Sequence, residues 1–400
     1  MIGGQFIHSI KDLIGESKEK KKVELPKEDE QPHIPTKQEE KKQINTVPKI
    51  RDSSPSILND TVAFDCVLVE GKRDQDIALP HTEMQQQKKA EDLGESLLVR
   101  PILNTTQTTI SHASQTPSFK SQSQIIDGKA LSTKIREQLA KQAEKFEKKN
   151  KRKVGLAVVI IGDDPASHVY VKNKIKACEE IGIKSYVVKR DINTTQDQLV
   201  EIIQTLNESD EVDGIITQLP LPRHLNEAEI LELIDSRKDV DGFHVENAGK
   251  LFTGQDSLRP CTPAGIIELI KSTKKRLEGK HAVIIGRSNI VGKPIAMMLL
   301  EENCTVTICH SRTKNLARHT KRADILVAAI GKKEFVTGDM IKNGAIVIDV
   351  GINRHEGKLY GDVNFEQASK VASHITPVPG GVGPMTITML MANSIKAASK

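Results

Sequence analysis

The feature that most constrains the fold is a regular alternation of strand-like and helix-like segments that begins near residue 125. Short apolar runs predict strands at 154–161, 183–189, 213–217, 281–285, 305–309, 324–329 and 345–349. Between and around them, helical spacing predicts helices at 129–149, 166–181, 195–207, 292–302 and from Met385 onward. Strands that alternate with helices of this length favour parallel β-α-β units with helices packed on a twisted sheet. We therefore predict a two-domain α/β protein.

The first 123 residues differ from the rest. Charged runs at 18–22 and 39–42, and a Ser/Thr/Gln-rich stretch before residue 125, leave few apolar positions at any regular period. A segment that can bury little apolar surface does not offset the entropy lost when its backbone is ordered. We predict a largely disordered extension over 1–123, in which only 6–14 (a short amphipathic helix) and 61–70 (a strand) could be structured.

Composition narrows the function classes. The net charge is only +5, aromatic residues make up 3% and Trp is absent, so we expect no nucleic-acid partner that depends on base stacking. No apolar run approaches the roughly 20 residues of a membrane helix, and the start lacks a secretory or mitochondrial signal. The five cysteines show no metal-ligand spacing, so we expect no metal and a cytoplasmic protein with reduced thiols. Cys304 and Cys309 fall in a strand that we predict to be buried.

The turn at 286–292 follows a predicted strand and opens a helix, where backbone N–H groups can hold a pyrophosphate. It departs from Gly-x-Gly-x-x-Gly because Ser288 stands at the second glycine, so alone it is a weak motif. The next strand is followed by Arg312, where an acid would meet a free ribose 2′-hydroxyl. Arg287 and Arg312 suit a 2′-phosphate because guanidinium groups are planar, permanently charged donors. We predict a Rossmann-like domain over 269–383 that binds NADP rather than NAD; solvated loop arginines are the alternative.

Four further segments carry polar side chains that could react if they converge. Lys174 follows Tyr170 by four residues on a predicted helix, so both project from one side. Gln218 stands at the carboxyl end of a predicted strand, where ligands of parallel sheets gather. Asp241 lies in an Asp-Val-Asp-Gly turn, and 377–384 is rich in proline and glycine. Taken singly, Lys174 could be a solvated helix residue, Tyr170 a buried ring and Asp241 a turn cap.

In their order and spacing, these segments resemble the bifunctional methylenetetrahydrofolate dehydrogenase/cyclohydrolase family over residues 124–398. The matching segments are 164–174, 218–222, 238–243, 259–263, 286–288, 349–353 and 375–386. The resemblance implies a folate-binding catalytic domain over 124–268 that a C-terminal helix at 384–400 completes. It also implies tetrahydrofolate derivatives as substrates and a homodimer. The chain stops at Lys400, with no room for a formate-activating synthetase domain, so we expect no use of ATP.

The resemblance also implies two reactions in one pocket. Hydride passes from the methylene carbon of 5,10-methylenetetrahydrofolate to the nicotinamide, and water then opens the methenyl product to 10-formyltetrahydrofolate. Lys174 would be the catalytic residue of the hydrolytic half, because desolvation and the methenyl cation would make it release its proton near neutral pH. Gln218 would orient this amine, Tyr170 would stack on the folate, and Asp241 would accept hydrogen bonds from the pterin.

The remaining implied contacts come mostly from segments without bulky side chains, which let the backbone approach a ligand. The implied substrate contacts are Leu219, Pro379, Gly380, Gly381, Val382 and Gly383, besides the four residues above. The implied cofactor contacts are Gly286, Arg287, Ser288 and Ile352, with Ser311 as a plausible addition. Two alternatives stay open: a dehydrogenase without the hydrolytic half, and an interaction protein whose extension tethers the enzyme to an unknown partner.

Overall fold

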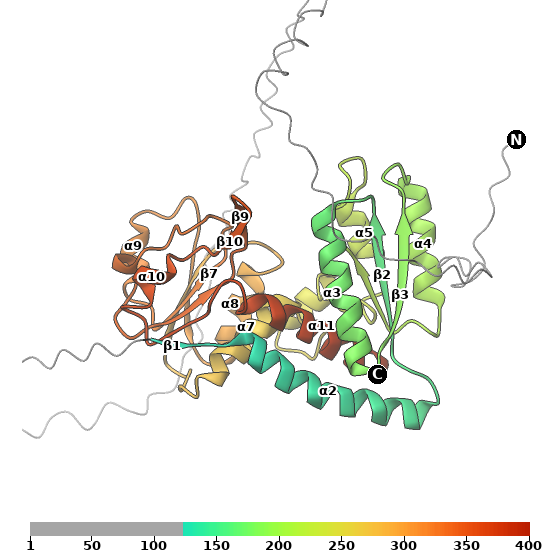
Figure 1. Ribbon diagram of the computed structural model, residues 1–400, viewed down its shortest axis with the longest axis horizontal. Helices are drawn as coiled ribbons and strands as arrows, with labels where there is room; N and C mark the ends of the chain where they lie inside the picture. The colour runs from blue at the N-terminus through green and yellow to red at the C-terminus, as the bar shows by residue number, and fades with distance from the viewer. Residues whose placement is uncertain (1–122) are drawn as a thin grey trace, which may run out of the picture. The chain divides into compact units, whose positions relative to one another are not determined.

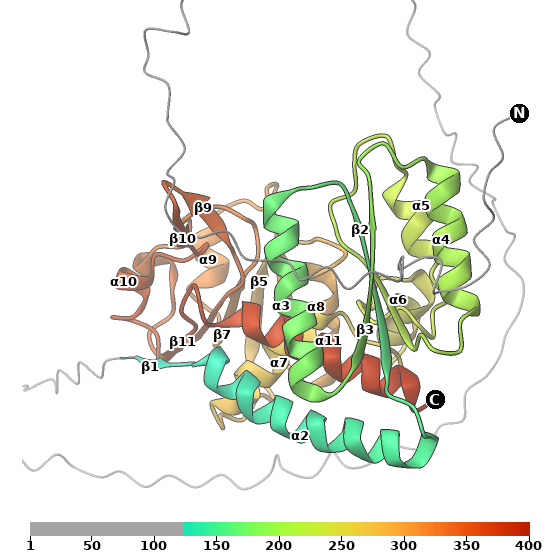
Figure 2. The ribbon, with the colours of Figure 1, turned by 45° about the vertical axis from the view of Figure 1, so that its right-hand side comes forward.

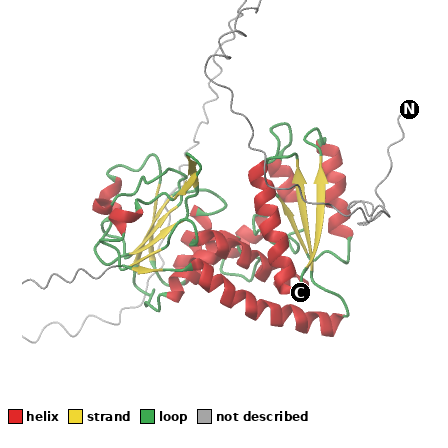
Figure 3. Ribbon diagram, viewed as in Figure 1, coloured by secondary structure: helices red, strands yellow, loops and turns green. Residues whose placement is uncertain are grey.

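The computed structural model describes residues 123–400, and Figure 1 shows their path. They contain a three-stranded and a six-stranded sheet, both wholly parallel, and a two-stranded hairpin (Figure 3). The predicted two-domain α/β class is thereby confirmed. The helix predicted at 6–14 and the strand predicted at 61–70 lie outside the described residues. Within the described part, no helix is both long enough and apolar enough to span a membrane.

The smaller sheet has the strand order β3-β2-β4. Its strands are β2 (Gly155–Ile161), β3 (Lys184–Arg190) and β4 (Gly214–Thr217). Every residue of the central strand β2 is buried, because helices cover both faces of the sheet. Leu156, Val158 and Ile160 join a core with α2 (Gly128–Asn150), α3 (Pro165–Ile181) and α11 (Val382–Ala398). The alternate residues of β2 pack with α4 (Gln196–Glu208) and α5 (Glu227–Leu233) (Figure 2).

Local sequence signals set the ends of α3, the helix that carries Tyr170 and Lys174. The Asp164 carboxylate accepts the Ser167 N–H at 2.8 Å, which satisfies one of the free donors of the first turn. Gly182 ends the helix in the left-handed conformation at φ 87°, which glycine adopts without a steric penalty. The predicted helix at 166–181 is thus found almost residue for residue.

The larger sheet has the strand order β1-β11-β8-β7-β5-β6. Its strands are β1 (Gln124–Ile125), β5 (His281–Ile285), β6 (Thr305–Cys309), β7 (Ile325–Ala328), β8 (Ile346–Asp349) and β11 (His374–Ile375). One face packs on α7 (Cys261–Ser272) and α8 (Gly292–Glu301). The other face packs on α9 (Leu316–Thr320), η2 (Gly338–Met340) and α10 (Phe365–Ala368). β5 is flanked by β6 and β7, so the strand order reverses there, which is where ligands of such sheets bind.

Two strands of this sheet differ from expectation. β1 is one edge of the larger sheet, although residues 124 and 125 belong by sequence to the first domain; a two-residue strand leaves no detectable periodicity. The prediction that 305–309 is a buried strand is wrong. β6 is the other edge, with Thr305 and Ile308 exposed and only Cys309 fully buried. Cys304 is also buried, but it lies one residue before the strand.

The C-terminal helix α11 joins the two sheets. It packs against α7, α2 and α3, as Figures 1 and 2 both show, and it starts at Val382 rather than at the predicted Met385. Its buried Met385, Met389 and Met391 belong to one hydrophobic core that runs from the smaller sheet to the larger one. The segment just before α11 is the glycine-rich 377–381, which therefore lies where the two domains meet.

Candidate active site

Lys174 and Gln218 meet at the carboxyl end of the smaller sheet. The Lys174 Nζ donates to Gln218 Oε1 at 3.1 Å, and Gln218 Nε2 donates to the Leu219 carbonyl at 2.8 Å. Gln218 directly follows β4, and Lys174 lies on α3, which covers this sheet. Lys174 forms no ion pair with another described residue, and both side chains are partly exposed. The carboxamide thus holds the amine in place without neutralising it.

Asp241 reaches the same strand end because its loop runs beside β4. Asp239 forms a parallel bridge to Ile215 within β4, and Asp241 follows two residues later. The Asn393 amide, from α11, donates to the carbonyls of Val240 and Arg259 at 2.8 Å each and fixes the loop. Gly242 follows at φ 74°, where a Cβ would lie 2.6 Å from the Arg259 carbonyl carbon, so only glycine fits.

The Asp241 carboxyl lies in an electrostatic field shared with Lys174. Dense packing by protein atoms raises its pKa to about 6, although solvent still reaches the side chain. The Lys174 ammonium lowers this pKa and the Asp239 carboxylate raises it further. At neutral pH Asp241 is therefore mostly ionised and can accept hydrogen bonds from a ligand.

The proline- and glycine-rich segment is held by the start of α2. The Lys129 N–H donates to the Gly380 carbonyl at 3.0 Å, and Gly380 itself has φ 104°. A Cβ on Gly128 would lie 1.9 Å from the Gly381 carbonyl oxygen, so the two backbones are in direct contact. Val378–Pro379 and Leu219–Pro220 are cis peptide bonds. The backbone of 379–383 is therefore presented at a fixed position.

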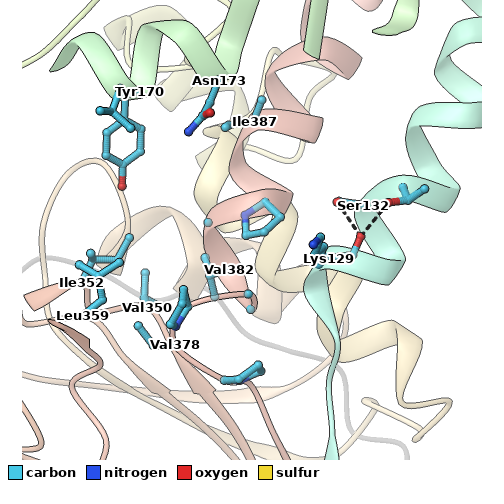
Figure 4. Close-up of a pocket in the computed structure, with 18 of the residues that line it drawn as sticks. Lys129, Ser132, Tyr170, Asn173, Val350, Ile352, Leu359, Val378, Val382 and Ile387 are labelled. Atoms are coloured by element: carbon cyan, nitrogen blue, oxygen red, sulfur yellow. Dashed lines mark hydrogen bonds between the residues drawn. The ribbon is translucent and has the colours of Figure 1, made fainter. Parts of the chain in front are cut away.

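A cavity of about 800 Å³ opens beside this segment. Besides residues 377–384, it is lined by the start of α2, by one side of α3 and by residues 349–352 at the end of β8. In Figure 4, Tyr170 extends from α3 toward Ile352 and Leu359, the latter on β10 (Lys358–Tyr360). Tyr170 is 43% exposed, which leaves its ring available to stack on a flat ligand.

The predicted residues fall into two groups around α3. Tyr170, Ile352 and residues 379–383 line the cavity. Lys174, Gln218 and Asp241 do not line it; they form the contact and charge cluster at the end of β4. Tyr170 links the groups because it lies one helical turn before Lys174 on α3. A ligand that stacks on Tyr170 therefore has the amine within reach of its other end.

In the turn at 286–292, the backbone packs so closely at both glycines that a side chain would not fit. Gly286 has φ 129°, and a Cβ there would lie 2.2 Å from the Ala329 carbonyl oxygen. A Cβ on Gly292, the first residue of α8, would lie 2.4 Å from the Gly286 carbonyl oxygen. The Ser288 hydroxyl accepts the N–H groups of Val291 and Gly292 at 3.2 Å each. Ser288 thus satisfies two backbone donors at the start of α8 and ties the turn to the helix.

Three exposed polar side chains surround this turn: Arg287, Ser311 and Arg312. Neither arginine forms an ion pair with another described residue, so two full positive charges remain available. A glycine cradle at a helix start, with free guanidinium groups beside it, fits a phosphate-rich dinucleotide. Among the described residues, no group of His, Cys, Asp and Glu side chains is arranged to hold a metal ion.

Several cavity residues were missed by the sequence analysis. Asn173 lies three residues after Tyr170 and lines the same cavity, and its helical spacing was the available signal. Four cationic side chains also line the cavity: Lys129, Arg136, Lys176 and Arg354. Only the acids Glu137, Glu180 and Asp349 oppose them, and Glu180 pairs with Arg136 at 2.9 Å. These cations come from three distant segments, so no local pattern could reveal them.

Comparisons with known proteins agree on one family. Residues 126–241 match the tetrahydrofolate dehydrogenase/cyclohydrolase catalytic domain, and 260–400 match the NAD(P)-binding domain of the same family. Bifunctional protein FolD of Acetivibrio thermocellus is 58% identical over 278 residues, which are 69% of this chain and 97% of that protein. The crystal structure of FolD from Campylobacter jejuni is 53% identical, with a TM-score of 0.68, and the match covers 69% of this chain and 98% of that one. FolD from Trypanosoma brucei, solved with NADP and an inhibitor, is 36% identical with a TM-score of 0.67, over 69% of this chain and 97% of that one.

Proposed function

The chain belongs to the tetrahydrofolate dehydrogenase/cyclohydrolase family, and from that premise we infer which of its residues perform the two reactions. The protein is a bifunctional methylenetetrahydrofolate dehydrogenase and methenyltetrahydrofolate cyclohydrolase that uses NADP. NADP supplies the nicotinamide carbon that accepts hydride from 5,10-methylenetetrahydrofolate. The methenyl product is then hydrolysed to 10-formyltetrahydrofolate.

We propose that Lys174 handles the protons of the hydrolytic step. Water adds to the methenyl carbon and loses a proton, which leaves a hydroxyl on that carbon. N5 is then protonated, the bond from the carbon to N5 breaks, and the hydroxyl loses its proton to solvent as the formyl C=O forms. A single amine beside the carbon can accept the first proton and deliver the second. The observation that carries this proposal is the 3.1 Å hydrogen bond from Lys174 Nζ to Gln218 Oε1, which fixes the amine at the carboxyl end of β4.

Asp241 and Tyr170 hold the pterin in this proposal. The mostly ionised Asp241 carboxylate accepts the pterin amino and N3–H groups, and the exposed Tyr170 ring stacks on the substrate. Tyr170 lies one helical turn before Lys174, and the Asp241 carboxyl interacts with the Lys174 ammonium, so a pterin held by both would bring the one-carbon unit near the amine. Holding a reacting carbon at a fixed position lowers the barrier for both hydride transfer and hydrolysis.

The cationic part of the cavity suits the other end of the substrate. A folate ends in a glutamate with negative carboxylates, and Lys129, Arg136, Lys176 and Arg354 line the cavity beyond Tyr170. We propose that this end of tetrahydrofolate lies among them. The backbone of 379–383 would then pass along the middle of the substrate, with Leu219 near the pterin.

We also propose the division into domains. The catalytic domain comprises 124–268 with the helix at 384–400, and the NADP-binding domain comprises 269–383. The smaller sheet with α11 supports the first, and the glycine turn of the larger sheet supports the second. The four described cysteines are buried thiols, in keeping with the cytoplasmic location that we propose.

A homodimer through β6 is part of the proposal. Among the described strands, β6 pairs on one side only, so its outer edge offers free backbone groups. Exposed apolar side chains flank it: Ile308 on β6, Leu300 on α8, and Phe252 on α6 (Val245–Phe252), which contacts α8. A second copy related by a two-fold axis would pair the two edges and cover these side chains. Ile308→Lys should then give a monomer in sedimentation analysis, and an unchanged dimer would exclude this edge.

One assay of the purified protein tests the function. With 5,10-methylenetetrahydrofolate, NADP should be reduced and 10-formyltetrahydrofolate should accumulate, with slower turnover when NAD replaces NADP. Supplied methenyltetrahydrofolate should be hydrolysed without any cofactor. Cofactor reduction with methenyltetrahydrofolate as the only product would instead identify a dehydrogenase without the hydrolytic half.

A further inference from the structure

Two buried carboxylates lie together at the carboxyl edge of the larger sheet, and neither has been given a role above. Asp349 is the last residue of β8, and Asp362 follows the hairpin of β9 (Asn353–His355) and β10. Both are almost completely buried, and neither forms an ion pair with another described residue. Buried carboxylates without a cation are costly unless backbone donors satisfy them. Their hydrogen bonds therefore reveal what they hold.

Asp362 fixes the segment that follows β7. Its carboxylate accepts three consecutive backbone N–H groups, of Ile330 at 2.7 Å, Gly331 at 3.0 Å and Lys332 at 2.7 Å. It also accepts the side-chain amide of Asn353 at 3.0 Å. One carboxylate thereby ties the exit of β7 to the start of β9.

Asp349 ties Asp362 in turn to the end of β8. Its carboxylate accepts the N–H groups of Gly351 at 3.2 Å, Asp362 at 2.8 Å and Val363 at 3.0 Å. Its own N–H donates to the Thr376 hydroxyl at 2.8 Å, beyond β11. The ends of β7, β8 and β11 are thus connected through the two carboxylates.

Two glycines make room for this arrangement. A Cβ on Gly351 would lie 2.0 Å from Asp362 Oδ1, and a Cβ on Gly361 would lie 1.7 Å from Asp349 Oδ2. Neither glycine has a positive φ, so their backbones would accept other residues. The requirement for glycine therefore comes mainly from the two carboxylates, with the Asp362 backbone nitrogen also 2.8 Å from a Cβ on Gly351.

The segments that are held lie at the carboxyl edge of the larger sheet, and one of them borders the large cavity. Residues 330–332 and 350–353 follow neighbouring parallel strands on the β7 side of the strand-order reversal, and Val350, Gly351 and Ile352 line the large cavity. Ile352 is the residue assigned to the cofactor on this side. We propose that Asp362, together with Asp349, is a positioning residue for NADP that holds these two segments where the nicotinamide half of the cofactor binds. This inference rests on the proposed function for the identity of the ligand.

The alternative is that the pair only stabilises the domain, and the two can be separated. In Asp362→Asn, an NH₂ group replaces one oxygen and faces backbone N–H donors, so the strand-end segments must shift. Isothermal titration of the folate-free variant with NADP should then give a Kd raised about tenfold, as expected when a hydrogen bond to a charged acceptor is lost. Cyclohydrolase activity, measured on methenyltetrahydrofolate without NADP, should stay within about twofold of wild type, because that step uses no cofactor.

Asp213→Asn is the matched control. Asp213 is also a buried carboxylate that accepts a backbone N–H, from Gly155 at 2.8 Å, and it pairs with Arg152 in the first domain. The Asp213→Asn variant should have a lower melting temperature than the wild type but the same Kd for NADP. Asp362→Asn with a melting temperature lowered as in Asp213→Asn but an unchanged Kd would overturn the proposal.

Two further variants keep the test decisive if Asp362→Asn does not fold. Gly351→Ala displaces the Asp362 carboxylate and should raise the Kd as Asp362→Asn does, whereas Asn353→Ala removes one donor and should raise it less. Unchanged affinity in both would also refute the proposal. Wild-type protein that binds NADP but neither oxidises nor hydrolyses folates would instead refute the proposed function.

Discussion

The carboxyl ends of the two sheets prepare for ligands in different ways. At the smaller sheet the proposed reactive groups are side chains: Lys174, Gln218 and Asp241 come from three segments and meet as an amine, an amide and a carboxylate. At the larger sheet the backbone forms the site, through the turn at Gly286 and the strand ends that Asp362 holds. In the site that we propose, reaction depends on functional groups in one region, whereas cofactor binding depends on close backbone packing in the other. Changes in the two regions should have separable effects.

The largest expected effect in the second region comes from Gly286→Ala. The φ of 129° and the Cβ position 2.2 Å from the Ala329 carbonyl oxygen leave no room for a methyl group. Dehydrogenase activity should fall by about 100-fold or more, since backbone strain and a displaced turn both oppose cofactor binding. Hydrolysis of supplied methenyltetrahydrofolate should persist.

Gly279→Ala is the control for this change. It also has a positive φ, of 73°, but a Cβ there would meet nothing within 4 Å. It should cost only about 1 kcal/mol of stability and leave both activities in place. Equal losses of the two activities in Gly286→Ala would show that the regions are not separable.

Replacing both Arg287 and Arg312 by leucine tests whether these side chains bind the 2′-phosphate of NADP. If they bind the 2′-phosphate, kcat/KM for NADP should fall about tenfold or more, because charged hydrogen bonds are lost. The kcat/KM for NAD should change by less than about twofold, because NAD has no 2′-phosphate. Arg318→Leu, at an exposed position on α9, is the control. A parallel loss with both cofactors would mean that the arginines do not read the 2′-phosphate.

The pH dependence of substrate binding tests the first region. The pKa of Asp241 is raised to about 6, so this carboxylate becomes protonated as the pH falls through 6. The KM for the folate should rise on that acidic limb, and Asp241→Asn should remove the limb. The effect of Asp241 on folding stability depends on pH in the opposite direction. The folded state holds the Asp241 proton more tightly than the unfolded chain does. Its contribution to the free energy of unfolding is therefore present below pH 3.8 and is lost as the pH rises through about 6.

The smallest effect is expected from removing residues 1–122, because every residue that we assign to the site lies after them. Turnover with both substrates should match that of the full chain within experimental error. A comparison of proteins captured by the two forms tests the tether hypothesis separately. A large loss of turnover would show that the extension contributes to the enzyme itself.

Sequence predicted the first region better than the second. Lys174 and Tyr170 stood out because helical spacing places them on one side, and Gln218 because it ends a strand. Asp349 and Asp362 gave no such signal: Asp349 ends an apolar run, and an aspartate beside glycine, as at Asp362, usually indicates a turn. Their role appears only when the ends of β7, β8 and β11 are brought together. Likewise, nothing in the apolar pattern of 305–309 distinguished an edge strand from a central one.

The most direct test of the central claim is the hydrolysis of methenyltetrahydrofolate by Lys174→Met, compared with Lys172→Met. Lys172 lies two residues away on the same helix and is exposed, so its loss should change little. Lys174→Met should slow hydrolysis by about 10²–10⁴-fold, the usual contribution of a general acid or base, while some NADP reduction remains. Equal hydrolysis rates in the two variants would contradict the assignment of Lys174 as the catalytic residue.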